Sequence, residues 1–397
     1  MKTHLQKLIP ALCVIFLVGF QSEGDYRAFH SRILVVDMHN DVTQRMLAGG
    51  DISRRMLHGQ SDLVRFREGG VGLQFFSIWV PPEKRSRPYD AQADEQIDSV
   101  ESFVRRNAGD VGLALKSWDI RDLAKAKKFV VMMGMEGGHP IMDDLAKLEH
   151  FYTRGIRYMT LTWNNSTDWA SSASDETSPG AKLEHRGLTD FGKRVVRKMD
   201  ELGIMVDVSH AGEQTFWDVT KTTIRPIIAS HSNAWTLCHN RRNLKDDQMK
   251  AIARSGGLVC VTFAPWFLDS TFTKKELAML TRNKARITRY RAGLTGDEFI
   301  KDQLVGEYLR KEYGPIRPSL SRVVDHIDYI VRLIGIDHVG IGSDFDGISV
   351  TPKGLEDVSC FPNLTRELMK RGYSAMDITK IYGYNFIRVL KIMEPTQ

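Results

Sequence analysis

Five segments of the chain carry histidine, aspartate or glutamate directly after a short apolar run. They are Asp37-Met-His-Asn-Asp41, Met135-Glu-Gly-Gly138, Asp207-Val-Ser-His210, Ala229-Ser-His-Ser232 and Gly342-Ser-Asp-Phe-Asp-Gly347. In the first segment, His39 and Asp41 are two residues apart, so an extended strand directs both side chains to the same side. Imidazole nitrogens combined with carboxylate oxygens suit zinc or a similar divalent ion. The first hypothesis is therefore a metal centre.

Each of these motifs is weak alone, and their combination is informative. A single His-x-Asp arises easily by chance, and a carboxylate after a strand often caps the next helix. Five strand ends that all carry such groups are harder to explain by structural roles alone. A pair of bound ions could acidify a shared water and polarise a carbonyl. Residues better explained by supporting or local roles are Asp37, Asp207, Asp346, His139, His185, His239 and His338.

The segments with metal-binding chemistry need elements that bring them to one place, and the apolar pattern supplies them. Eight apolar, β-branched runs predict strands at Ile33–His39, Val71–Val80, Phe129–Met135, Ile156–Trp163, Gly203–Ser209, Pro226–Ser230, Gly257–Phe263 and His338–Gly342. Between most of these runs, apolar residues recur at the spacing of a helix, which predicts helices at 91–106, 188–202, 246–254 and 323–334.

This alternation predicts an α/β fold, a (β/α)₈ TIM-type barrel closed by a last helix over Ala375–Ile392, and the five segments at its strand ends make the barrel metal-dependent hydrolase-like. Barrel enzymes keep their active sites at the carboxyl ends of the strands, which is where all five segments fall. An open doubly wound sheet is the alternative, but no glycine-rich phosphate fingerprint follows the first predicted strand.

Composition and domain organisation are those of an ordinary globular protein. The chain has 397 residues, of which 42% are hydrophobic and 26% charged, with a net charge of +6. The positive charge is spread out, with no basic run or basic-aromatic cassette, so we expect no nucleic-acid partner. For residues 25–397 the sequence predicts a single catalytic barrel domain with a charged helical insertion near 264–317.

The first 24 residues differ from the rest of the chain. Lys2 and Lys7 precede an apolar stretch from Leu8 to Phe20, which small and polar residues follow. This layout is typical of a secretory signal peptide, and an uncleaved N-terminal anchor that tethers the protein to the membrane is the alternative. We therefore expect export across the inner membrane to a periplasmic or envelope-associated location.

Taken in order and spacing, the motifs resemble the membrane dipeptidase (renal dipeptidase) family of zinc peptidases. The resemblance covers nearly all of the chain after the leader. Besides the segments above, it includes Gly187-Leu-Thr-Asp-Phe-Gly192, Ser230-His-Ser-Asn-Ala234, Arg241-Arg-Asn243, Gly340-Ile-Gly-Ser-Asp-Phe-Asp-Gly347 and Gly354-Leu-Glu-Asp357. It implies a metallodipeptidase that hydrolyses dipeptides with a free C-terminal carboxylate through a metal-bridging hydroxide.

The resemblance also implies a role for each site residue. Two zinc ions per chain would be held, one by His39 and Asp41 and the other by His210 and His231, with Glu136 bridging both. Asp344 would contact the metal-bound water and move its proton toward the leaving amine. Arg242 would bind the substrate carboxylate, in keeping with the bidentate geometry of guanidinium. A homodimer would be in keeping with the family.

One position departs from the family pattern. The stretch Leu161-Thr-Trp-Asn-Asn165 has Trp163 where the family carries a histidine that stabilises the charged oxygen of the tetrahedral intermediate. We hypothesise that the Asn164 amide or the metal takes over that role.

Two other functions stay open from the sequence. One is a different binuclear metallohydrolase on the same barrel, acting on an N-acyl amino acid, a lactone or a phosphoester. Arg242 favours a substrate that carries a carboxylate. The other is a non-catalytic envelope binding protein that has kept the metal ligands, and Trp163 is the feature that favours it.

Overall fold

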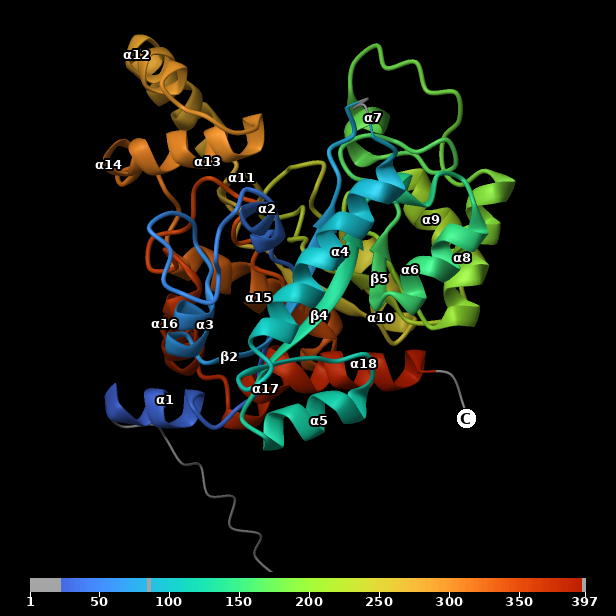
Figure 1. The fold of residues 1–397 in the computed structure, drawn as a ribbon, viewed down its shortest axis with the longest axis horizontal. Coiled ribbons are helices and arrows are strands. Elements are labelled where there is room, and N and C mark those ends of the chain that lie inside the picture. The colour runs from blue at the N-terminus through green and yellow to red at the C-terminus, as the bar shows by residue number, and fades with distance from the viewer. Residues whose placement is uncertain (1–22, 84–86, 395–397) are drawn as a thin grey trace, which may run out of the picture.

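The computed structural model describes residues 23–83 and 87–394 of the chain (Figure 1). Within these residues, nine strands form one parallel sheet: β1 (Val35–Asp37), β2 (Val71–Trp79), β3 (Val111–Leu113), β4 (Phe129–Glu136), β5 (Ile156–Thr160), β6 (Met205–Asp207), β7 (Ile227–Ala229), β8 (Leu258–Val261) and β9 (Val339–Ile341). Eight of them follow the order β1-β2-β4-β5-β6-β7-β8-β9, and β3 pairs with the start of β4 outside this path.

The two ends of this path meet, which closes the sheet into a barrel. The Met38 amide donates to the Ile341 carbonyl at 2.9 Å, and the Asp344 amide donates to the His39 carbonyl at 3.1 Å. A parallel bridge joins Asn40 to Phe345 just beyond the strands. The predicted (β/α)₈ barrel is therefore confirmed.

All eight predicted strands lie where the apolar runs place them, although most are shorter. The predicted Ile156–Trp163 strand ends at Thr160, so Trp163 lies in the loop beyond it. β3 was not predicted, because a three-residue strand centred on Gly112 carries too little apolar pattern to stand out.

Helices connect the strands and cover the outside of the barrel. The longer ones are α1 (Glu23–His30), α4 (Tyr89–Arg106), α5 (Ser117–Lys125), α6 (Leu145–Thr153), α8 (Asp190–Leu202), α9 (Glu213–Thr222), α10 (Asp246–Arg254), α12 (Phe272–Ala292), α13 (Glu298–Tyr308), α15 (Leu320–Ile334), α16 (Phe361–Lys370) and α18 (Asn385–Met393). The short ones are α2 (Val42–Leu47), α3 (Leu63–Glu68), α7 (Ala173–Thr177), α11 (Pro265–Leu268), α14 (Arg310–Tyr313) and α17 (Ala375–Thr379), with 3₁₀ turns at His139–Ile141, Ile336–His338 and Val358–Cys360.

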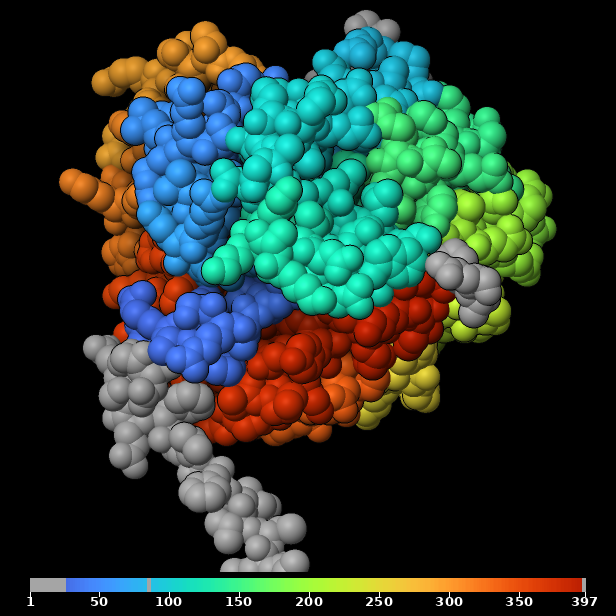
Figure 2. Space-filling view, turned by 60° about the horizontal axis from the view of Figure 1, so that its bottom comes forward, coloured from blue at the N-terminus to red at the C-terminus, as the bar shows by residue number. Residues whose placement is uncertain are grey.

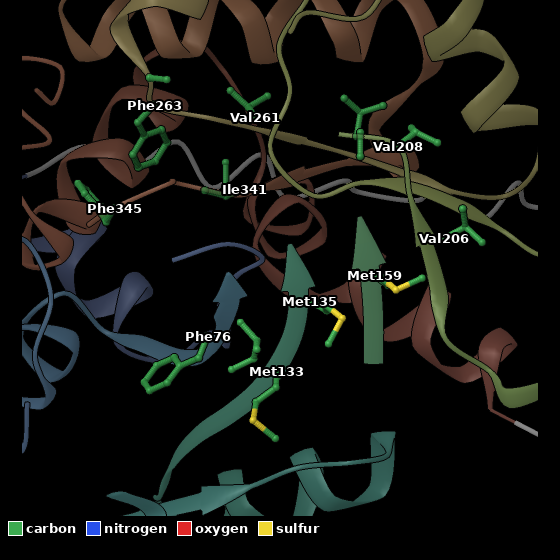
Figure 3. Packing of buried hydrophobic residues seen from close by; sticks show 14 of the residues in the cluster. Phe76, Met133, Met135, Met159, Val206, Val208, Val261, Phe263, Ile341 and Phe345 are labelled. Carbon is green, nitrogen blue, oxygen red and sulfur yellow. The ribbon is translucent and has the colours of Figure 1, made fainter. Parts of the chain in front are cut away.

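Alternating side chains of the strands build two apolar layers. Phe76 of β2 and Met133 of β4 belong to the outer layer, which packs under the helices (Figure 3). Phe75 and Met132, one residue before each, belong to the inner layer together with Phe386 of α18. Because α18 contributes to the inner layer, this helix closes one end of the barrel. Figure 1 shows α5 and α18 below the strands, and Figure 2 shows that closed end as a continuous surface.

The predicted final helix over Ala375–Ile392 is confirmed as an unbroken helical run, and its middle turn is wider than an α-helix. The segment divides into α17, a π-helical turn over Lys380–Tyr384, and α18. Gly383 explains the wider turn, because a Cβ on this residue would lie 2.8 Å from the Leu34 carbonyl oxygen. The turn thus lets the helix backbone approach β1 closely, and π-bulges of this kind are local widenings of an α-helix.

The segment between β8 and β9 forms α11, α12, α13 and α14, which Figure 1 shows together at one corner of the molecule. Its own apolar cluster packs against the loop after β9 and consists of Phe272, Met279, Val305, Leu309, Tyr313 and Val350. The contact is close, since a Cβ on Gly306 of α13 would lie 2.5 Å from the Ser349 carbonyl oxygen. The helical segment is therefore held to the loop that follows β9 and carries a predicted site residue, Asp344.

The predicted leader, residues 1–24, lies outside the described residues except for its last two, which begin α1. Among the helices of residues 23–83 and 87–394, none combines the length and the apolar character that crossing a bilayer requires.

Candidate active site

The carboxyl ends of the strands bring the five predicted metal ligands together. Glu136 is the last residue of β4, and the register aligns it with Trp79 at the end of β2 and with Thr160 at the end of β5. The remaining ligand candidates lie two to four residues beyond β1, β6 and β7, where the strands turn into loops. All five side chains are buried, and they are His39, Asp41, Glu136, His210 and His231.

Glu136 divides its two carboxylate oxygens between two groups of ligand atoms. Its Oε1 lies 3.0 Å from His210 Nε2 and 3.5 Å from His231 Nε2. Its Oε2 lies 3.4 Å from His39 Nε2, which in turn lies 3.4 Å from Asp41 Oδ2. Ligand atoms about 2.1 Å from one tetrahedral zinc ion are about 3.4 Å apart, so the spacing fits two neighbouring ions bridged by Glu136.

The hydrogen bonds of two imidazole rings show why this arrangement needs a cation. His210 Nδ1 lies 3.2 Å from the Asn164 Oδ1 acceptor. His231 Nδ1 lies 2.8 Å from Ser230 Oγ, whose own proton goes to a carboxylate, Asp207 Oδ2, at 2.6 Å. Both Nδ1 atoms therefore carry the proton, which leaves two Nε2 lone pairs facing each other at 3.1 Å. A positive ion between them removes this repulsion.

His39 gives a second indication of the same kind. Its Nδ1 is 2.9 Å from the Tyr158 hydroxyl, whereas its Nε2 is buried and has no hydrogen-bond partner. Its ring stacks on that of His231 with centroids 3.9 Å apart. A buried nitrogen without a partner is costly, and a metal ion would satisfy it.

Burial sets the protonation states that metal ligands require. It lowers the pKa of His210 to about 3, and the charge of Arg242 acts in the same direction. Burial also lowers the pKa of His231 well below its usual value. For Glu136, burial opposes ionisation, but the nearby His39 and His210 outweigh it and hold the carboxyl pKa well below its ordinary range. For His39, burial lowers the pKa, but Tyr158, Glu136 and Asp41 outweigh it and raise the pKa well above its usual value. Without a bound ion, the site thus offers two neutral imidazoles, His210 and His231, and an ionised carboxylate.

Three buried aspartates hold the loops that carry the ligands. Asp207 accepts hydrogen bonds from the Ser209 and Ser230 amides at 3.0 and 2.8 Å, next to His210 and His231. Asp37 accepts from the Ser343 amide at 2.7 Å and from its hydroxyl at 2.5 Å. Asp346 accepts from Arg45 Nε at 2.6 Å. Each aspartate therefore supports a loop, as the sequence suggested, and lies outside the ligand set.

The loops at the site adopt strained backbone conformations. His210 has φ of 65° and Asp344 has φ of 66°, in the left-handed region that costs free energy for residues other than glycine. At the neighbouring Gly347, a Cβ would lie 2.3 Å from both Asp41 Oδ2 and Asp344 Oδ1. Only glycine fits there, because the backbone closes directly over these carboxylates. Burial raises the pKa of the Asp344 carboxyl well above its usual value, and the charges of Asp41 and Glu136 add to this effect.

Arg242 lies at the wall of the same cavity without an ionic partner. Its side chain is buried, its Nε has no hydrogen-bond partner, and its Nη2 reaches only the His231 carbonyl at 3.4 Å. The guanidinium lies 5.3 Å from the centre of the Phe267 ring. Burial lowers its pKa to about 10, so it stays charged at neutral pH. The charges of Glu136, Asp344 and Asp207 attract the guanidinium, but no carboxylate of the described residues forms a salt bridge with it, which leaves its N–H groups available for an anionic ligand.

A cavity of about 180 Å³ joins these groups. It is lined by Asp41, Glu136, His210, His231, Asp344 and Arg242, and also by Trp79, Trp163, Asn164 and Phe299. Every predicted site residue except His39, which is fully buried beneath it, therefore borders one space. The histidines that the sequence assigned to local roles have partners outside the cavity. Three form hydrogen bonds with backbone carbonyls, His139 with Val80, His185 with Gly187 and Thr167, and His338 with Gly257. The ring of His239 stacks on that of Trp235.

Sequence reasoning missed several residues at this site. Tyr158 contacts His39 from inside the barrel, and its hydroxyl within a buried strand was the only signal. Trp79 was included in a predicted strand but not in the site. Phe299 comes from α13, and nothing in the sequence indicates that this helix reaches the cavity.

Comparisons with known proteins identify one family. A family model described as membrane dipeptidase (peptidase family M19) matches residues 24–397. Dipeptidase 3 of Mus musculus and of Rattus norvegicus are each 31% identical to the chain, over 373 and 372 residues, which cover 91% of it. The matched regions make up 64% and 65% of the mouse and rat proteins, so the chain spans less than two thirds of these relatives.

Solved structures show the same fold. The probable dipeptidase PvdM from Pseudomonas aeruginosa is 30% identical, with a TM-score of 0.76, and the match covers 93% of this chain and 98% of that one. A metallopeptidase from Rhodobacter sphaeroides, solved with a phosphinate mimic of the dipeptide L-Ala-D-Ala, is 26% identical with a TM-score of 0.73, covering 91% and 99%. The chain therefore belongs to the membrane dipeptidase family, peptidase family M19, as the resemblance of its motifs predicted.

Proposed function

We propose that the protein is a zinc-dependent dipeptidase that hydrolyses dipeptides with a free C-terminal carboxylate. The observation that carries this proposal is the position of Glu136, whose Oε1 faces the Nε2 atoms of His210 and His231 and whose Oε2 faces Nε2 of His39. The unpaired, buried Arg242 borders the same cavity and supplies a site for a carboxylate. Metal ligands and carboxylate anchor together favour a small peptide over a neutral ester or lactone.

Two zinc ions, one with His39 and Asp41 and one with His210 and His231, would acidify a water molecule and polarise the scissile carbonyl. Asp344 lies at the rim of this space, half-buried and next to Asp41. Because its pKa is raised, this carboxyl is suited to accept a proton and pass it to the leaving amine. Glu136 would bridge the ions and complete the ligand set.

Arg242 would hold the C-terminal carboxylate of the substrate. A buried guanidinium without a counter-charge is unfavourable, and a bound carboxylate satisfies it with charge-assisted hydrogen bonds. The related metallopeptidase from Rhodobacter sphaeroides was solved with a mimic of a dipeptide, which supports a ligand of this size for the present cavity.

Asn164 would stabilise the developing oxyanion in place of the histidine that Trp163 replaces. Its Oδ1 already faces His210 Nδ1 at 3.2 Å. The amide NH₂ group is then the part of Asn164 left to donate to a substrate oxygen in the cavity that this residue lines.

The test is hydrolysis of a panel that includes dipeptides, the same dipeptides with a C-terminal amide, N-acyl amino acids and phosphoesters. We expect the wild-type protein with zinc to prefer free dipeptides. Replacing the guanidinium in Arg242→Gln should reduce kcat/KM for free dipeptides about 100-fold, mainly through KM, because the substrate carboxylate loses its ionic partner. The amidated dipeptides should be hardly affected.

The exposed neighbour Arg241 provides the matched control, and Arg241→Gln should leave both substrate types nearly unchanged. Preference for N-acyl amino acids or phosphoesters over dipeptides would replace this proposal by the corresponding hydrolase. Equal loss on free and amidated dipeptides would remove Arg242 from carboxylate binding.

We also propose export to the periplasm or envelope, on the basis of Lys2, Lys7 and the apolar stretch that follows them. The intact mass of the exported protein would show whether residues 1–24 are removed or kept as an anchor. A homodimer stays a prediction from the family resemblance alone.

A further inference from the structure

Three aromatic side chains form one side of the cavity, and we refer to Trp79, Trp163 and Phe299 as the aromatic wall. The Trp79 and Trp163 rings have centroids 5.0 Å apart, and the Trp79 and Phe299 rings 5.6 Å apart. Trp79 is buried, whereas Trp163 and Phe299 are half-buried and border the cavity. The wall therefore presents a continuous apolar surface to whatever occupies the cavity.

The order of the strands places Trp79, whose ring contacts both Trp163 and Phe299, across the barrel from Arg242. In a closed ring of eight strands, those four positions apart lie opposite each other, so β2 faces β7 and β4 faces β8. Trp79 ends β2, while Arg242 follows β7 and stands against Phe267 of α11, which follows β8. The metal ligands lie between the two sides. A dipeptide whose carboxylate binds Arg242 and whose peptide bond lies over the metal-binding side chains must extend toward the aromatic wall.

The wall is fixed in place from both of its ends. The Trp79 carbonyl accepts hydrogen bonds from Gln44 Nε2 at 2.9 Å and from Gln96 Nε2 at 2.5 Å. Phe299 belongs to the first turn of α13, which is capped by the Asp297 side chain accepting from the Ile300 amide at 2.9 Å.

The far end of α13 is also tied to the barrel. Glu307 accepts from the Gly59 amide at 2.7 Å and bonds His58 Nδ1 at 2.6 Å. The close contact of Gly306 with Ser349 adds a third attachment. The position of Phe299 over the cavity is therefore part of the packed fold.

From this arrangement we propose that the aromatic wall binds the side chain of the first residue of the dipeptide, so that the enzyme prefers substrates with a large apolar N-terminal residue. The inference rests on the proposed dipeptidase function. Leucine, methionine or phenylalanine in the first position would be removed from water by contact with the three rings, and a charged side chain there would lose its hydration without a partner. Phe299, which the helical segment between β8 and β9 supplies, is thus a specificity-determining residue.

The test compares three substrates, Leu-Ala, Ala-Leu and Ala-Ala, with the full-length zinc-loaded protein. In Phe299→Ala we expect kcat/KM for Leu-Ala to fall about tenfold, mainly through KM, because one face of the leucine pocket is lost. The values for Ala-Leu and Ala-Ala should change less than twofold. Phe299→Leu should restore most of the activity on Leu-Ala, since it restores an apolar contact.

Leu277→Ala is the matched control, because Leu277 lies on α12 of the same helical segment and is 66% exposed. It should leave all three values unchanged, and thermal melting should show that each variant folds. An equal fall on all three substrates, or a larger fall on Ala-Leu, would overturn the assignment of the wall while leaving a dipeptidase in place. Wild-type protein inactive on every dipeptide would overturn the proposed function itself.

Discussion

At the scale of single residues, Trp163 is the position where the motif resemblance implies a histidine. Its ring packs against Trp79 and lies 6.2 Å from the His210 ring. An indole in this place adds apolar surface to the cavity and removes an imidazole donor. The next residue, Asn164, holds His210 and is the remaining side-chain amide at the cavity wall.

Asn164 provides a prediction that separates two roles. Asn164→Ala should lower kcat/KM about 100-fold if its NH₂ group stabilises the oxyanion. Asn164→Asp keeps an acceptor for His210 Nδ1 but has no NH₂ group, so we expect it to be as impaired as the alanine variant. Steady-state kinetics on one dipeptide measures both.

The adjacent Asn165, which does not line the cavity, is the control, and Asn165→Ala should keep most of the activity. Full activity in Asn164→Asp would assign the residue to holding His210 rather than to the oxyanion. Unchanged activity in Asn164→Ala would remove Asn164 from both roles.

The residues of the site were predictable from the sequence to different degrees. His39, Glu136 and His210 could be predicted because each lies at the end of an apolar run, and a barrel brings all such positions to one end. Tyr158 and Phe299 were not, because their contacts depend on the closed ring and on the path of the segment between β8 and β9. A sequence pattern records which side of a strand a residue occupies, but not which distant loop reaches it.

At the scale of elements, the strands were easier to predict than the helical connections. Apolar runs such as Val71–Trp79 are buried on both faces and stand out, whereas β3 is too short to do so. The π-helical turn at Lys380–Tyr384 depends on the packing of Gly383 against Leu34. That contact between the two ends of the chain has no local signature.

The contact between α15 and α11 leads to a prediction about acid stability. His326 of α15 is fully buried, accepts from the Ala234 amide at Nδ1 and lies 3.2 Å from the Leu268 carbonyl through Nε2. Burial, with a smaller contribution from Arg322, lowers its pKa to about 4. An unfolded histidine takes up a proton below about pH 6.5, whereas the folded one does so only near pH 4.

The stability that the neutral ring contributes is therefore present at pH 7 and is lost as the pH falls from 6.5 toward 4. In His326→Gln, which can keep both hydrogen bonds, the free energy of unfolding should fall by about 2 kcal/mol less between pH 7 and pH 5 than in the wild type. Urea unfolding at the two pH values measures this. Equal losses in both proteins would show that His326 does not control acid stability.

At the scale of the whole molecule, the barrel separates stability from chemistry between its two ends. α18 closes one end with the apolar residues Phe386, Val389 and Leu390, which belong to the inner layer. The other end contains buried ionisable groups, imidazole lone pairs that face each other, and left-handed backbone conformations. All of these cost free energy in the absence of a ligand. Bound cations would offset these costs, so metal binding and the integrity of this end should be linked.

The most direct test of the account is the metal content of the purified protein, measured by elemental analysis alongside dipeptide hydrolysis. We expect two divalent ions per wild-type chain, loss of at least one ion and of activity in His231→Ala, and no change in His239→Ala, whose histidine is exposed and stacks on Trp235. A wild-type protein that binds no metal after zinc is added, or a His231→Ala protein that keeps two ions and full activity, would contradict it.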